Sequence, residues 1–86
     1  MHSVELLEEG IAVLKRLGYR VRLEPLDGVA GGLCEFGGRR YLYLDIAQKP
    51  LEQLHEVLEV LKENDRTDGI ALSQPLAQLI ARRRAA

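Results

Sequence analysis

Hydrophobic positions recur every three to four residues from Ser3 to Leu17, which is the spacing of an amphipathic helix. Ser3 is predicted to cap the first turn, and Gly18 suits the position just beyond the C-terminus. Gly10 falls on the apolar side of this helix. A glycine there indicates the close approach of another part of the backbone.

From Tyr19 to Glu24 the pattern changes to strict alternation. Val21 and Leu23 point to one side, and Arg20 and Arg22 point to the other. This pattern predicts a strand that is buried on one face only.

Two further apolar runs, Leu33 to Phe36 and Arg39 to Asp45, are separated by Gly37-Gly38. Two glycines between alternating runs predict a β-hairpin with a two-residue turn. The preceding segment, Pro25 to Gly32, is rich in turn-forming residues and is predicted to be a loop.

Helical spacing returns after residue 48, and Pro50 suits a first helical turn. The apolar stripe of this helix consists of Leu51, Leu54, Val57, Leu58, Val60 and Leu61. The segment from Asn64 to Gly69 interrupts it. Ser73 and Pro75 then begin a short third helix, which ends in Arg82-Arg83-Arg84.

The predicted order is helix, three strands, helix, helix. Short connections favour a meander, so we expect an α+β domain with two layers, in which helices cover one face of a three-stranded antiparallel sheet. The 86 residues suffice for a single domain, residues 1–86, with a modest core. Domains this small often gain stability by oligomerisation, so a self-associating surface is expected.

A two-residue turn fixes which hairpin side chains share a face. Leu33, Leu42 and Leu44 form one face, the leucine face, with Glu35 and Arg40 at its tip. The aromatic face is formed by Cys34, Phe36, Arg39, Tyr41 and Tyr43, with Arg20 and Arg22 of the first strand beside them.

We expect the helices to cover the leucine face and to leave the aromatic face open as an interaction surface. In one alternative, the third helix folds back over the aromatic face with Leu76, Leu79 and Ile80. In another, a turn longer by one residue exchanges the two faces.

Charge and composition narrow the function classes. Hydrophobic residues make up 47% and charged residues 29%, as in folded globular proteins, and the net charge is -1. This charge argues against a dedicated nucleic-acid binder. One cysteine allows no internal disulfide, and neither a signal peptide nor a membrane span is recognisable, so a soluble cytoplasmic protein is expected. A composition rich in Leu, Glu and Arg and poor in Asn fits a GC-rich or thermophilic bacterium.

The segment His55-Glu56-Val57-Leu58-Glu59 differs by one residue from the helical motif in which two histidines bind zinc. Glu59 stands in place of the second histidine, and all three polar residues lie opposite the leucine stripe. We interpret the segment as a solvated helix face and expect neither a metal nor a cofactor.

Other motifs have equally plain interpretations. Cys34 has no histidine predicted nearby and is expected to be a buried structural residue rather than a nucleophile. The run from Gly28 to Gly32 leads into a strand rather than a helix N-terminus, which favours a turn over a phosphate loop. Arg82-Arg83-Arg84 is expected to solvate a helix C-terminus, and contact with an acidic partner is the alternative.

The stretch GGLCEFGGRRYLYLD, followed by a leucine helix that contains Glu52-Gln53-Leu54, resembles a family of small bacterial proteins of unassigned function. The resemblance implies the helix, sheet, helix order but no activity, cofactor or catalytic residue. The sheet followed by the His55-Glu56 helix is also similar to the minimal core of zinc-dependent metallopeptidases. The second histidine of that family is missing here, so no activity is transferred.

The leading hypothesis is a non-enzymatic interaction module that forms a homodimer or binds a protein partner through the aromatic face. Single-stranded nucleic acid on the same face is the alternative, because aromatic rings beside arginines suit base stacking with phosphate contacts. An enzyme ranks third, and no membrane association is expected.

Overall fold

The computed structural model describes residues 2–29 and 31–85. Its elements follow the predicted order: α1 (Ser3–Arg16), β1 (Tyr19–Glu24), β2 (Gly32–Phe36), β3 (Arg39–Asp45), α2 (Pro50–Lys62), the short 3₁₀ helix η1 (Asp65–Gly69) and α3 (Gln74–Ala85). The predicted α+β class is confirmed. The expected interruption after the second helix, from Asn64 to Gly69, contains the 3₁₀ helix η1.

The sheet is mixed, so the expected antiparallel meander is wrong. The strand order is β1-β3-β2, with β1 parallel to β3 and β2 antiparallel to β3. Tyr41, Leu42 and Leu44 of β3 are buried, whereas most of β2 is exposed. The central strand is therefore β3, which has apolar residues on both faces. In a meander the central strand would have been β2.

The loop of residues 25–31 makes this order possible because it passes the end of β3. Gly31 lies against the backbone there: a Cβ atom at this position would be 2.6 Å from the carbonyl oxygen of Tyr43. Only glycine allows the loop to pass this close. Within the predicted loop, Ala30 lies outside the described residues.

The predicted hairpin is confirmed in its register. Gly37 and Gly38 have φ angles of 60° and 75°, the left-handed pair that a two-residue hairpin turn needs. Cys34 pairs with Tyr41 and Phe36 with Arg39, as expected from the spacing.

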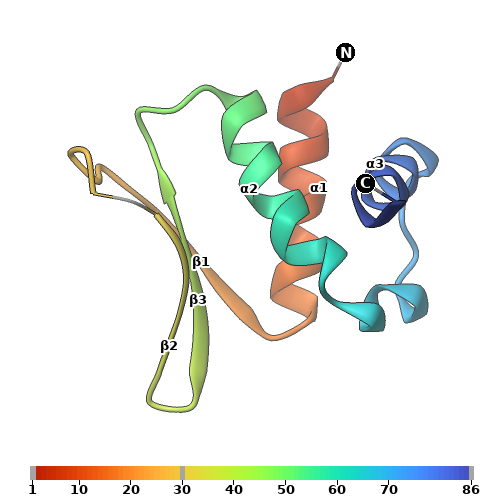
Figure 1. Cartoon of the computed structure of the whole chain (residues 1–86), viewed down its shortest axis with the longest axis horizontal. Coiled ribbons are helices and arrows are strands. Elements are labelled where there is room, and N and C mark those ends of the chain that lie inside the picture. Colours follow the sequence, from red (N-terminus) through yellow and green to blue (C-terminus); the bar gives the residue numbers. More distant parts are fainter. Residues whose placement is uncertain (1, 30, 86) are drawn as a thin grey trace.

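Helices α1 and α2 lie side by side on the leucine face of the sheet, and α3 packs on their far side (Figure 1). The structure thus has a further helical layer beyond the expected two. Leu76 and Ile80 of α3 are buried against α1 and α2 rather than on the aromatic face. The alternative in which α3 folds over the aromatic face is therefore wrong.

The core lies between the leucine face and the helices. Its fully buried side chains come from all three helices and from β3: Leu14, Leu42, Leu44, Leu54, Val57, Leu58, Leu61 and Leu76. Leu33 remains 54% exposed because it belongs to the edge strand β2, which extends beyond the helices.

Helix ends differ in how they are capped. Ser3 is the first residue of α1 rather than its cap, and His2 precedes it without a side-chain cap, so the predicted Ser3 cap is wrong. Ser73 does cap α3, because its hydroxyl accepts a hydrogen bond from the backbone N–H of Leu76 (3.3 Å). Its own N–H and hydroxyl donate to the Glu9 carboxylate, which ties α3 to α1.

Candidate interaction surface on the open face of the sheet

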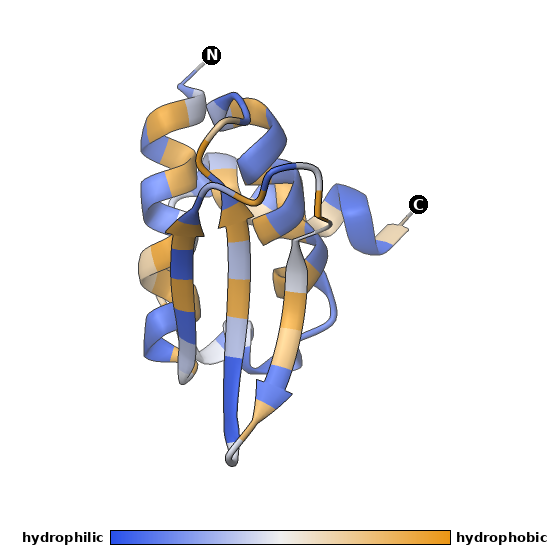
Figure 2. Cartoon of the chain, turned by 90° about the vertical axis from the view of Figure 1, so that its left-hand side faces the viewer, coloured by the Kyte–Doolittle hydropathy of each residue, from blue (hydrophilic) through white to orange (hydrophobic). Residues whose placement is uncertain are grey.

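The aromatic face is open. Figure 2 looks straight onto it, with the strands in front and the helices behind. The strand register brings Arg20 beside Tyr41 and Arg22 beside Tyr43, across the parallel β1–β3 pair. The seven residues predicted for this face thus share it, although the pairing of β1 with β3 was not expected.

The three aromatic rings of this face form a continuous stack. Phe36 and Tyr41 lie 4.8 Å apart between ring centroids at an interplanar angle of 10°, and Tyr41 and Tyr43 lie 6.2 Å apart at 24°. Tyr41, in the middle, is only 9% exposed, whereas Phe36 is 58% exposed. The stack is therefore preformed, and more than half of the surface of one of its residues, Phe36, is available to another molecule.

Charges are distributed unevenly along the aromatic face. Arg20, Arg22 and Arg39 are exposed around the rings. Glu24 and Asp45 pair with each other across β1 and β3 at the C-terminal ends of both strands. Alternation places them on the same face as Arg22 and Tyr43. The face is thus basic over most of its length and acidic at one end.

Cys34 is exposed, so the expectation of a buried cysteine is wrong. Its strand lies at the sheet edge, and its side chain belongs to the uncovered face. We expect the native monomer to react with a thiol reagent about as fast as the unfolded chain does, which a labelling time course followed by mass spectrometry would measure. Strong protection in dilute native protein would contradict this placement.

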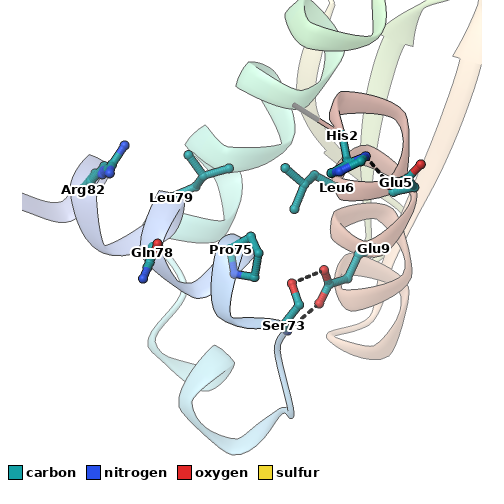
Figure 3. A pocket seen from close by; sticks show the side chains of 9 residues that line it. All are labelled: His2, Glu5, Leu6, Glu9, Ser73, Pro75, Gln78, Leu79 and Arg82. Atoms are coloured by element: carbon teal, nitrogen blue, oxygen red, sulfur yellow. Dashed lines mark hydrogen bonds and ion pairs between the residues drawn. The ribbon is translucent and has the colours of Figure 1, made fainter.

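One hollow on the helical side lies between the N-terminal parts of α1 and α3 (Figure 3). It encloses about 440 Å³, and Leu6, Pro75 and Leu79 supply its apolar wall. At its polar rim, His2 pairs with Glu5 and the Glu9 carboxylate is bound to Ser73. The Glu9–Ser73 contact joins α1 to α3, whereas the His2–Glu5 pair lies within the N-terminus of α1.

A second cleft of about 390 Å³ lies beneath the overhanging strand β2. Leu33 and Leu42 line its apolar side, and Glu56 and Glu59 of α2, with Glu63 just beyond its end, line the other. It faces away from the aromatic face. Leu33 and Phe36 are thus both exposed on β2 but lie on opposite faces of the sheet, so substitutions at Leu33 can serve as controls for substitutions at Phe36.

The His55 segment of α2 follows the expected orientation in part. His55 and Glu59 are exposed, and Glu56 is partly buried. Glu59 accepts a hydrogen bond from Arg83 of α3 and pairs with Lys62 (3.1 Å). Arg83 and Lys62 hold the pKa of the Glu59 carboxyl below its usual value. Within residues 2–29 and 31–85, no group of three or more His, Cys, Asp or Glu side chains is placed to hold a metal ion.

Two of the three arginines at the end of α3, Arg83 and Arg84, contact the protein itself. Arg83 binds Glu59, and Arg84 donates hydrogen bonds to the carbonyls of Lys62 and Asn64. As expected, all three arginines lie in the last turn of α3, and Arg82 is exposed there; contact with an acidic partner stays an alternative. The run joins α3 to the end of α2.

No family model matches the chain, and comparison with curated proteins and with solved structures finds no match either. The resemblances drawn from the hairpin and the following helix therefore remain expectations. Among the described residues, no helix combines the length and apolarity needed to cross a membrane.

Proposed function

We propose that this chain is a non-enzymatic interaction module that associates through the aromatic face. The observation that supports this most directly is Phe36, an aromatic side chain 58% exposed on an uncovered sheet and stacked on a buried tyrosine. Tyrosine, phenylalanine and arginine are enriched in the parts of interfaces that carry binding energy. A preformed stack also loses little side-chain entropy when it binds.

The first test is self-association of Phe36→Asp. Burying a phenylalanine side chain contributes about 1.5–3 kcal/mol, so its loss should weaken association at least tenfold. Phe36 is exposed in the monomer, so the fold should survive. The readout is molar mass by sedimentation over a concentration series, with circular dichroism to confirm folding.

Leu33→Asp is the matched control. Leu33 lies on the same strand, is 54% exposed and belongs to the opposite face. We expect Leu33→Asp to associate like the wild type. Equal effects of both substitutions, or a wild-type chain that stays monomeric throughout the series, would contradict association through the aromatic face.

Single-stranded nucleic acid is the second candidate for the same face, supported by three exposed arginines beside stacked rings. Glu24 and Asp45 count against it, because they would face the phosphates of any strand that followed the sheet. Binding of a labelled oligonucleotide that falls steeply with salt would favour this candidate.

A further inference from the structure

Along the aromatic face, the charge changes from basic to acidic toward the C-terminal ends of β1 and β3. Because β1 and β3 are parallel, their C-terminal ends meet at one edge of the sheet, where Glu24 lies beside Asp45. Arg20 lies four residues away along β1, on the same face. A surface with one basic and one acidic end is self-complementary when two copies are placed in opposite directions.

We propose that the occupant of the aromatic face is a second copy of this chain, packed face to face with its strands antiparallel to those of the first. This arrangement rests on the proposed function. The two-fold axis lies between the sheets, at right angles to the strands. Symmetry then forms each contact twice, with Arg20 of one copy over Glu24 of the other. Parallel strands would instead bring each acidic end against its equivalent.

The centre of this arrangement falls midway between residues 20 and 24, at Arg22 and its neighbour Tyr43. Tyr43 is half-buried and stacks on Tyr41 at one side only, so its ring can also receive a guanidinium from the other copy. An arginine over a tyrosine ring is a favourable contact. The two-fold axis also places the Arg22 side chains of the two copies opposite each other, so each guanidinium has to turn sideways, toward the Tyr43 ring of the other copy.

The size of the face sets the expected affinity. Three strands about 4.8 Å apart, with about six residues each, cover a footprint of roughly 14 by 20 Å. Stable dimers usually bury about 800 Å² on each partner, which exceeds this footprint. We therefore expect a weak dimer whose formation depends strongly on the charge pairs.

Charge reversal tests the arrangement. Both Arg20 and Glu24 are exposed, and neither side chain makes a hydrogen bond or ion pair within the described residues. Arg20→Glu would oppose Glu24 of the partner, and Glu24→Arg would oppose Arg20. Each variant alone should raise the dimer dissociation constant at least tenfold, measured by sedimentation at low salt.

Two combinations should restore association. The double variant with both substitutions regains opposite charges at each contact, so it should dimerise like the wild type. An equimolar mixture of the two single variants should form a heterodimer, because every contact then joins a glutamate to an arginine. Glu8→Arg, an exposed change of equal charge on α1, should leave association unchanged.

The outcomes separate this inference from the proposed function. Loss of association in Phe36→Asp, without recovery in the double variant or the mixture, would overturn the antiparallel arrangement and keep the aromatic face as the interface. A wild-type chain that is monomeric at every concentration would overturn both.

Discussion

Gly10→Leu is expected to lower the free energy of unfolding by about 2 kcal/mol or more, because α1 and α2 leave no space for a side chain at this point. A Cβ atom on Gly10 would lie 2.8 Å from the Cγ1 atom of Val57. Val57 is fully buried, and as a β-branched residue it cannot turn aside freely. Urea unfolding followed by circular dichroism measures the loss.

A double-mutant cycle with Val57→Ala isolates this contact. Val57→Ala alone should destabilise the protein by leaving a cavity, whereas in the Gly10→Leu background it should restore part of the stability. Helix propensity favours leucine over glycine by about 1 kcal/mol and opposes the expected loss. A Gly10→Leu variant about 1 kcal/mol more stable than the wild type, which is the gain expected from propensity alone, would therefore show that the helices do not meet here.

The local elements could be predicted because their signals are local. Gly37-Gly38 between alternating runs fixes the turn, and a two-residue turn fixes the register of Cys34 with Tyr41. The order of the strands could not be predicted in this way, because alternation does not show which strand becomes central. The informative signal was the run from Tyr41 to Leu44, apolar on both faces, which suits a strand with neighbours on both sides.

The aromatic face could be predicted in composition but not in detail. The hairpin register identified its rings, and the alternation in β1 identified Arg20 and Arg22. Continued for one more step, the same alternation would have identified Glu24 as well. Its pairing with Asp45 required the parallel β1–β3 register, and the exposure of Cys34 required the edge position of β2.

The core and the proposed interaction surface lie on different faces of the sheet. The core lies between the leucine face and the helices, and further contacts tie α3 to α1 and α2. Phe36, the exposed ring of the aromatic face, takes no part in that core. Substitutions at Phe36, Arg20 and Glu24 should therefore change association with little change in the stability of the monomer.

Arg84→Met is expected to lower the free energy of unfolding by about 1.5 kcal/mol, because its guanidinium closes the end of α2. It donates to the carbonyls of Lys62 (3.1 Å) and Asn64 (2.8 Å) and to the hydroxyl of Thr67 (3.0 Å). Methionine keeps the apolar stem and removes all three bonds. For a domain of this size the loss corresponds to a fall in Tm of roughly 6–12 °C, measurable by calorimetry.

The neighbouring arginine supplies the control. Arg82 is exposed, and its side chain makes no hydrogen bond or ion pair within the described residues, so Arg82→Met should change stability by less than about 0.5 kcal/mol. Arg84→Lys keeps the charge but not the planar donor geometry, and it should fall between Arg84→Met and the wild type. Equal losses at both arginines would instead indicate a general effect of positive charge at a helix C-terminus. Only a loss specific to Arg84 supports its role in joining α3 to the end of α2.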